Sequence, residues 1–289
     1  MGAEGYHAGM EWKLTSPTVL RDLLAQHGIR LRSELGQHFL VDENLLARIV
    51  ELVEVQGDEI ALEVGAGVGT LTRALAPRVR ELVAVEVDQR LIPVLEETTA
   101  AHPNVRILLR DFRELSLGSF GERILVVGNL PYGITSDVLV KLIREREAVG
   151  RAVFMVQAEV GRKLVAPPGP EASRLGVHLR GYFDVELVRK VSRTVFFPPP
   201  EVDSALIRLS RLATPRVTAP EEALEWTLAV LFSARRKTLR RALLGRVPAA
   251  EVDRLLAELG LDPRIRGEAL PLGAMDRLAQ AMDRAGLVG

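Results

Sequence analysis

The sequence of 289 residues contains no cysteine. This absence excludes a disulfide framework, a thiolate zinc site, an iron–sulfur cluster and a cysteine nucleophile, and it favours a cytoplasmic protein. The chain also lacks any apolar run of the roughly 20 residues that a membrane span needs, and its N-terminus lacks the basic start and apolar stretch of a secretory signal. Its five histidines are scattered along the sequence, so we expect no metal site.

No charge is in excess over the whole chain, because 38 Lys+Arg balance 38 Asp+Glu. The zero sum hides a difference between the two ends. Residues 211–289 contain 13 Lys+Arg and 10 Asp+Glu, a net charge of +3, which leaves −3 for residues 1–210. The sequence therefore predicts a mildly basic C-terminal part attached to a mildly acidic remainder.

From about residue 58, short apolar runs alternate with longer segments of helical periodicity. Because these runs are apolar on both faces, they predict an α/β fold in which helices cover a parallel sheet. Two later runs are expected to complete the sheet, as an antiparallel edge. In chain order the expected strands are Ile60–Val64, Leu82–Val87, Val105–Leu109, Ile124–Val127, Ala152–Val156, Val185–Val191 and Ala205–Leu209.

The pattern changes at Ser210–Pro220, which contains two prolines and no apolar periodicity and therefore reads as a linker. Beyond it only helical periodicity is present, with breaks at Gly245–Pro248 and Gly260–Pro263 that predict four or five short helices. We expect an N-terminal extension (residues 1–34), an α/β domain (35–210) and a small all-helical domain (211–289).

A glycine-rich loop follows the first expected strand in the segment EVGAGVG, with Gly65 and Gly67 at its centre. Glycine allows a tight turn and lets the backbone approach a ligand that a Cβ would hold off. The spacing is GxGxG rather than the GxGxxG of dinucleotide-binding proteins. Alone, this loop is a weak signal, and a tight strand–helix turn that binds nothing is the alternative.

Two acidic residues at strand ends support a ligand site. Glu86 ends the second strand, where a carboxylate can accept hydrogen bonds from both hydroxyls of a ribose. Asp111 ends the third strand and is placed to accept from an adenine amino group. Since the carboxyl ends of parallel strands meet at one edge of the sheet, these positions predict a site for an adenosine compound.

The fourth expected strand leads into Asn129-Leu130-Pro131-Tyr132. The order of these elements resembles S-adenosylmethionine-dependent methyltransferases that act on the exocyclic amine of adenine. The lone pair of adenine N6 is delocalised into the ring, so this nitrogen is a poor nucleophile. Hydrogen bonds from N6–H to the Asn129 oxygen and to a main-chain carbonyl at Leu130 or Pro131 would favour a nucleophilic nitrogen and stabilise its developing positive charge. Tyr132 offers a face for stacking on the base.

Further motifs narrow the resemblance. They are LGQHFLVD (35–42), SRLG (173–176), FFPPPEVDSA (196–205) and FSARRKTLR (232–240). Together with NLPY, they resemble the small-subunit (16S) ribosomal RNA adenine N6,N6-dimethyltransferases, the KsgA/RsmA family, from about residue 35 to residue 287. The resemblance implies a Rossmann-like S-adenosylmethionine methyltransferase domain. It also implies dimethylation of two adjacent adenosines in a hairpin near the 3′ end of 16S rRNA, linked to small-subunit maturation.

The resemblance also implies roles for individual residues. For the cofactor, S-adenosyl-L-methionine, it points to His38, Leu40, Gly65, Gly67, Glu86, Asp111 and Asn129. For the reaction it points to Asn129, Leu130, Pro131, Tyr132 and Phe196. Phe196 is expected to stack on the second face of the target base, with a buried core position as the alternative. His38 and Gly133 depart from the family pattern, which often has Asn at both positions.

Five cations, Arg235, Arg236, Lys237, Arg240 and Arg241, lie within seven residues. Treated as one helix, the segment places all of them except Arg235 on one face. We expect this face to contact RNA phosphates, with a merely solvated face as the alternative.

Two other functions remain open. One is the related large-subunit rRNA adenine methyltransferase of the antibiotic-resistance type, and the other is a non-catalytic ribosome-assembly or transcription factor with the same fold. The expected partner is 16S rRNA in the small subunit or its precursor, and we expect the protein to be a monomer.

Overall fold

The structure, a computed structural model, describes residues 12–31 and 37–288. The first two residues of the LGQHFLVD motif therefore lie outside the described residues, as do residues 1–11 and 32–34 of the expected N-terminal extension. No helix among the described residues is long and apolar enough to cross a membrane.

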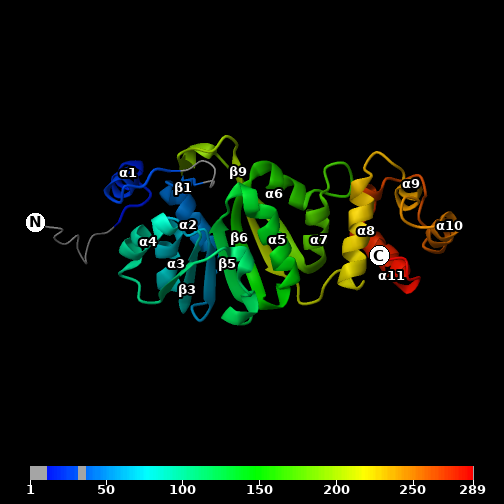
Figure 1. Ribbon diagram of the computed structural model, residues 1–289, viewed down its shortest axis with the longest axis horizontal. Helices are drawn as coiled ribbons and strands as arrows, with labels where there is room; N and C mark the ends of the chain where they lie inside the picture. Colours follow the sequence, from blue (N-terminus) through cyan, green and yellow to red (C-terminus); the bar gives the residue numbers. More distant parts are fainter. Residues whose placement is uncertain (1–11, 32–36, 289) are drawn as a thin grey trace, which may run out of the picture. The chain divides into compact units, whose positions relative to one another are not determined.

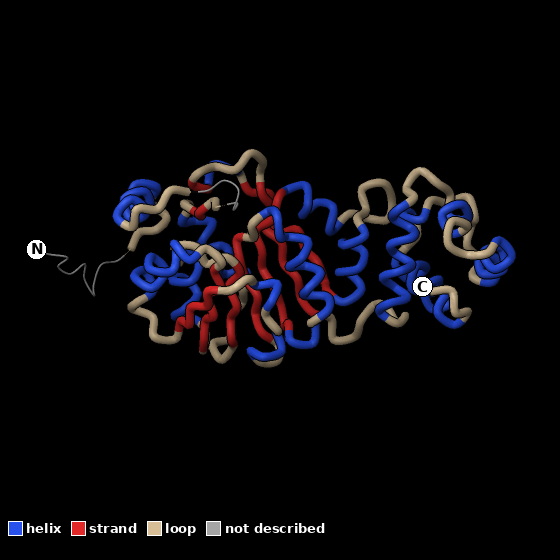
Figure 2. Tube along the Cα trace, viewed as in Figure 1, coloured by secondary structure: helices blue, strands red, loops and turns tan. Residues whose placement is uncertain are grey.

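A seven-stranded sheet forms the centre of the fold (Figures 1 and 2). Its strand order is β4-β3-β2-β5-β6-β9-β7. Strands β2 to β6 run parallel, and β9 runs antiparallel to β6. The strands are β2 (Ile60–Val64), β3 (Glu81–Glu86), β4 (Val105–Leu109), β5 (Ile124–Asn129), β6 (Val149–Gln157), β7 (Phe183–Val191) and β9 (Ser204–Arg211). The predicted α/β fold with a mostly parallel sheet is confirmed.

The sequence placed every strand of this sheet within a few residues but did not reveal a second, two-stranded sheet. In it, β1 (Phe39–Leu40) pairs antiparallel with β8 (Phe196–Phe197). The pairing joins Phe39 to Phe197 and Leu40 to Phe196. Runs of two residues carry no periodicity, so only the tertiary structure shows that Phe39–Leu40 and Phe196–Phe197 lie side by side.

Helices connect the strands: α1 (Pro17–Gln26), α2 (Glu43–Leu52), α3 (Thr70–Leu75), α4 (Ile92–Thr99), α5 (Thr135–Arg144), α6 (Ala158–Val165) and α7 (Arg174–Tyr182). Asp42 caps α2, because its carboxylate accepts from the main-chain N–H of Leu45 at 2.7 Å. The apolar stripes of α2 and α3 pack with inward-facing residues of β2, β3 and β5 in the main core cluster. These connections produce the topological switch point between β2 and β5, where open α/β sheets bind ligands.

Part of the expected N-terminal extension is folded. Pro17 occupies the first turn of α1, where its missing N–H costs no hydrogen bond. Leu20 and Leu23 of α1 are buried in a second apolar cluster that includes Phe39 and Leu91. This helix therefore packs against residues that also line the cavity described below.

By its contacts the chain divides into two compact units, residues 1–161 with 187–210 and residues 162–186 with 211–289. The three domains predicted from the sequence (1–34, 35–210 and 211–289) stay a prediction. They differ from the compact units at residues 162–186, which group with the C-terminal helices. One reason is visible in the loop before α7, where the main-chain N–H of Gly169 donates to the carbonyl of Glu268 at 2.8 Å.

The C-terminal part contains α8 (Glu221–Ser233), α9 (Leu239–Leu243), α10 (Ala249–Glu258) and α11 (Leu272–Arg284), in line with the number of helices expected (Figure 2). The expectation of one continuous basic helix through Arg235–Arg241 is wrong. The chain turns after Ser233 and starts α9 with Thr238 as its N-cap. It turns because Thr238 pairs with Arg266 in an antiparallel bridge and the Leu239 N–H donates to the Ile265 carbonyl at 2.6 Å.

Candidate active site

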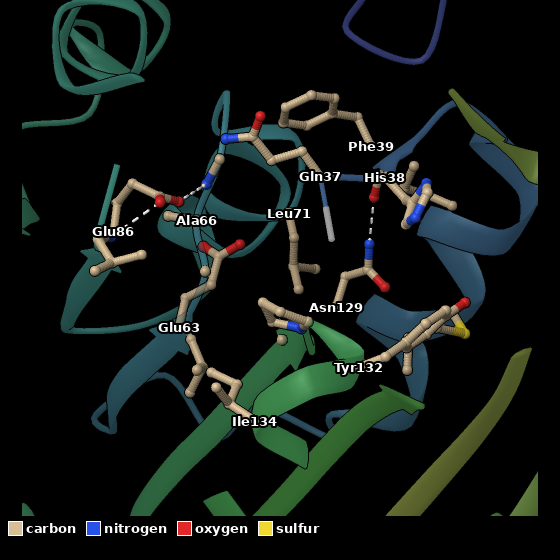
Figure 3. A pocket seen from close by; sticks show the side chains of 18 of the residues that line it. Gln37, His38, Phe39, Glu63, Ala66, Leu71, Glu86, Asn129, Tyr132 and Ile134 are labelled. Atoms are coloured by element: carbon tan, nitrogen blue, oxygen red, sulfur yellow. Dashed lines mark hydrogen bonds between the residues drawn. The ribbon is translucent and has the colours of Figure 1, made fainter. Parts of the chain in front are cut away.

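A cavity of about 750 Å³ opens at the carboxyl ends of the parallel strands, at the switch point of the sheet. Most of the residues that the sequence singled out line it, namely His38, Leu40, Gly65, Gly67, Glu86, Asp111, Asn129, Pro131, Tyr132 and Phe196. Leu130 is not part of the lining and is buried. The structure thus brings together residues from segments that are up to about 160 positions apart (Figure 3).

The glycine loop between β2 and α3 has the tight conformation that its glycines predicted. Gly65 and Gly67 have φ values of +73° and +61°, a backbone region in which other residues are strained. A Cβ on Gly67 would lie 2.9 Å from Cε1 of Phe39. The loop is also tied to the neighbouring strand, since the N–H groups of Gly65 and Ala66 both donate to the carbonyl of Val85. Glycine is therefore needed here for the conformation and for close packing.

Glu86 at the end of β3 is buried, with 6% of its surface exposed. One of its carboxylate oxygens accepts from the N–H groups of Val87 and Asp88 at 2.9 Å, and the other accepts from the N–H of Gly67 at 2.8 Å. Burial raises the pKa of Glu86, while these main-chain donors lower it. The carboxylate thus joins the glycine loop to the turn after β3, in addition to facing the cavity (Figure 3).

Asp88 and Gln37 form a contact that the sequence did not indicate. Gln37 donates from its side-chain amide to an oxygen of Asp88 at 2.7 Å. Arg90 donates to the same carboxylate and holds the pKa of Asp88 below its usual range. The segment Gln37–Leu40 is therefore fastened to the turn after β3, at the rim of the cavity.

Glu63 is the second buried acid of the site, and no role was predicted for it. It is 2% exposed, lines the cavity from the end of β2, and accepts a hydrogen bond from the Thr72 hydroxyl at 2.6 Å. Burial, with a smaller contribution from the charge of Glu86, raises the pKa of Glu63 to about 8. The sequence shows an acidic residue at the start of the EVGAGVG segment, but it does not show that this side chain is completely buried.

Asp111 lies two residues after β4, half-buried at the cavity wall. Arg113 contacts both of its carboxylate oxygens, the shortest distance being 2.6 Å, and this lowers the pKa of Asp111. Arg113 also reaches Asp137 in α5 at 3.3 Å. The carboxylate is therefore ionised and held in place by a residue that the sequence reading missed.

Asn129 closes the other side of the cavity at the end of β5. Its side-chain nitrogen donates to the main-chain carbonyl of His38 at 2.6 Å, which leaves its oxygen free to face the cavity (Figure 3). The carbonyl of Pro131 already accepts from the N–H of Ile134 and the hydroxyl of Thr135. Of the two main-chain carbonyls considered from the sequence, that of Pro131 thus already accepts two hydrogen bonds, and that of Leu130 belongs to a buried residue outside the cavity lining.

Tyr132 begins the short 3-10 helix η6 (Tyr132–Ile134) and is half-buried. The ring of His38 lies 6.0 Å from its ring, centre to centre, at an angle of 31°. His38 is fixed in turn, because its Nδ1 lies 2.8 Å from the carbonyl oxygen of Pro198. Gly133 has open space where a Cβ would be, so the difference from the common Asn creates no gap in packing.

Phe196 is 4% exposed and packs in the main core cluster with Leu40. It also forms part of the cavity wall. Phe197 is more exposed and carries the guanidinium of Arg21 5.3 Å above its ring. The buried position weighed as the alternative for Phe196 thus describes most of its surface, although the residue also lines the cavity.

Comparison with known proteins identifies the family. The model of the family "Ribosomal RNA adenine dimethylase" matches residues 28–283. The chain belongs to this family.

Its relatives agree with the match. Proteins named "Ribosomal RNA small subunit methyltransferase A" from Bacillus mycoides (strain KBAB4) and Bacillus cereus (strain B4264) are 38% identical to the chain over 283 residues, 93% of this chain and 97% of each relative. Among solved structures, the 23S rRNA methyltransferase ErmE is 32% identical, with a TM-score of 0.68 over 85% of this chain and 99% of that one. A dimethyladenosine transferase from Plasmodium falciparum has the same fold, with a TM-score of 0.77 over 86% of this chain and 98% of that one, at 24% identity.

As a member of the ribosomal RNA adenine dimethylase family, the chain is a methyltransferase with S-adenosylmethionine as methyl donor, which confirms the expected enzyme class and cofactor. The cavity fits this molecule. Its glycine loop leaves room for close approach, and its buried acidic side chains at the ends of β2 and β3 suit hydroxyl groups.

The five basic residues between positions 235 and 241 differ in their contacts. Arg235 donates to the carbonyls of Pro170 and Ala172 and lies over the ring of Phe232. Arg240 forms a two-point ion pair with Asp253, at 2.6 and 2.9 Å. Both are engaged within their own compact unit. The other three cations, Arg236, Lys237 and Arg241, are exposed on the turn and on α9.

Proposed function

We propose that this protein dimethylates N6 of two adjacent adenosines in the hairpin near the 3′ end of 16S rRNA, in the small ribosomal subunit or its precursor. The observation that carries the proposal is the orientation of Asn129, whose amide nitrogen is occupied by the His38 carbonyl at 2.6 Å while its oxygen faces the cavity. An amide oxygen held in this way accepts an N6–H and does not compete as a donor. The relatives with the highest identity reported above carry the name of a small-subunit methyltransferase.

In this proposal the cofactor lies along the glycine loop. Glu86 accepts hydrogen bonds from the ribose hydroxyls and Asp111 accepts from the adenine amine of the cofactor. Gly65 and Gly67 border its methionine part, with His38 and Leu40 on the other side. When bound, S-adenosylmethionine supplies an electrophilic methyl group on a positively charged sulfur.

The target base enters between Tyr132 and the edge of Phe196. Asn129 and a main-chain carbonyl, that of Leu130 or Pro131, accept the two N6–H groups, so that the nitrogen lone pair is directed at the methyl carbon. As the N–C bond forms and the S–C bond breaks, positive charge develops on N6, and these two oriented dipoles stabilise it. The methylated amine then loses its proton to water, so the site needs no strong general base. Pro131 holds the turn that aligns both acceptors.

RNA contact outside the cavity is proposed for Arg236, Lys237 and Arg241. The expectation from the sequence also included Arg235 and Arg240. In this proposal Arg235 instead holds the carbonyls of Pro170 and Ala172, and Arg240 pairs with Asp253. We also propose that the protein acts in the cytoplasm, where ribosomal subunits mature, and as a monomer.

The test is incubation of the protein with labelled S-adenosylmethionine and small subunits that lack the modification. Label in two adjacent adenosines near the 3′ end of 16S rRNA is the expected result. Naked large-subunit RNA in a parallel reaction tests the alternative favoured by the 32% identity with the 23S rRNA methyltransferase. Label only in large-subunit RNA would establish that alternative, and no label in either RNA would contradict the proposed reaction.

A further inference from the structure

Tyr132 is held at its outer end by a residue far away in the sequence. Its hydroxyl lies 3.0 Å from the hydroxyl of Ser204, 72 positions later in the chain. Tyr132 follows β5, whereas Ser204 is the first residue of β9. The two hydroxyls therefore connect the NLPY turn to the antiparallel part of the sheet.

The position of Ser204 is fixed by burial and by strand pairing. It is completely buried and lies opposite Gln157 in the register of β9 and β6. Just before it, the carbonyl of Asp203 accepts from the N–H of Ala158 at 2.9 Å. A serine hydroxyl on a strand anchored in this way has only its own χ1 rotation, so it defines where the tyrosine hydroxyl can lie.

A tyrosine side chain has two main torsions, χ1 and χ2, and fixing the hydroxyl restricts both. The ring is already limited on one side by His38, 6.0 Å away, which is itself bonded to the Pro198 carbonyl. Burial and the nearby charge of Asp203 raise the pKa of the Tyr132 hydroxyl, so it remains protonated near neutral pH and available for this hydrogen bond. The hydroxyl is thus used for orientation and not for proton transfer.

We infer that Ser204 is a positioning residue for the methyl transfer, because it holds the Tyr132 ring in the plane on which the target adenine stacks. The inference rests on the proposed function, in which Tyr132 contacts the base. Ser204 acts only through Tyr132 and belongs to none of the residues expected to touch the cofactor.

The same hydrogen bond can be removed from either end. Ser204→Ala deletes the buried hydroxyl, and Tyr132→Phe deletes its partner while it keeps the aromatic face. Each variant should reduce the single-turnover rate of methylation of small subunits roughly tenfold, since a lost hydrogen bond and a misplaced ring both act on the reactive geometry. The affinity for S-adenosylmethionine should stay within twofold of the wild type.

The double variant Ser204→Ala/Tyr132→Phe distinguishes positioning from two separate structural effects. Because both changes remove one interaction, its rate should equal that of either single variant and not the product of the two losses. Ser192→Ala is the matched control: it removes another hydroxyl–hydroxyl contact, 2.8 Å from Thr194, that lies on an exposed turn. Its rate should equal that of the wild type.

Several results would overturn the inference. A normal rate for Tyr132→Phe beside a slow Ser204→Ala would show that the serine acts by another route, and independent losses in the double variant would show the same. If Ser204→Ala fails to fold, Tyr132→Phe still decides, because its change lies on a half-buried ring. A wild type that transfers no methyl group to small subunits would instead overturn the proposed function, which separates the two failures.

Discussion

The side-chain nitrogen of Asn129 donates to the main-chain carbonyl of His38 at 2.6 Å, and this hydrogen bond joins the end of β5 to the segment before α2. This contact decides which end of the amide faces the cavity. A departure from the family pattern at position 38 leaves it intact, because the acceptor is main chain and any residue provides it. The identity of the side chain at 38 matters instead for the ring of Tyr132, which it faces.

Asn129→Ala should lower kcat roughly a hundredfold, comparable to the loss of one oriented dipole at a reaction centre. The amide oxygen meets a nitrogen that becomes positively charged only during the reaction, so KM for RNA should change much less than kcat. Steady-state and single-turnover methylation of small subunits measure both values. Asn104→Ala is the control, since Asn104 also donates to main-chain carbonyls, those of Ala76 and Val79, but outside the cavity.

Asn104→Ala should lower stability and leave the chemical step unchanged. If Asn129→Ala raises only a dissociation constant while the chemical step keeps its rate, the role proposed for Asn129 is wrong.

Glu86→Ala should weaken S-adenosylmethionine binding by about 2 kcal/mol or more, roughly thirtyfold in Kd, because hydrogen bonds to a carboxylate contribute more than neutral ones. The structure adds that the N–H groups of Gly67, Val87 and Asp88 lose their acceptor at the same time. Isothermal titration calorimetry checks the affinity. Glu122→Ala, a change at an exposed glutamate, should leave the affinity unchanged. Equal affinities for both variants would remove Glu86 from the cofactor site.

Glu63 predicts a specific pH dependence of stability. Its pKa is raised by burial from the usual value to about 8, so the folded protein keeps this proton while the unfolded chain ionises. The contribution of Glu63 is therefore complete below the unfolded pKa and is lost as the pH rises toward 8. Glu63→Gln mimics the protonated side chain and still accepts from Thr72.

The free energy of unfolding of Glu63→Gln relative to the wild type should consequently increase between pH 5 and pH 8, by an amount on the order of a few kcal/mol. Urea unfolding at both pH values measures it. A difference that does not change with pH would show that Glu63 titrates normally.

The three exposed cations predict a change in salt dependence. Replacing Arg236, Lys237 and Arg241 together with Gln should reduce the log–log salt slope of RNA binding by roughly 2 to 3, if each residue neutralises one phosphate. Arg240→Gln is the matched control, because Arg240 is paired with Asp253 and should alter the slope little. Filter binding at several salt concentrations gives both slopes.

Cofactor affinity should stay the same in all of these RNA-binding variants. If the triple variant has the salt slope of the wild type, these three residues do not contact RNA phosphates and are only a solvated surface.

The order of strands, the glycine loop and the acids at strand ends could be predicted from the sequence because each depends on neighbours along the chain. Apolar runs such as Ile60–Val64 indicate a buried parallel strand by composition, and the residue that ends such a strand must lie at the ligand edge of the sheet. The positions of Glu86, Asp111 and Asn129 follow from this rule alone. The motifs that indicate the family are local for the same reason.

The tertiary structure decided how side chains are used. Only the fold brings Ser204 to Tyr132 and the His38 carbonyl to Asn129, because long-range pairs leave no periodic signal in the sequence. It also divided the basic segment, since the bridge between Thr238 and Arg266 ends one helix and starts another where local propensity favoured continuity. The sequence determined which chemistry the chain carries, and distant contacts determined which of its residues are free to perform it.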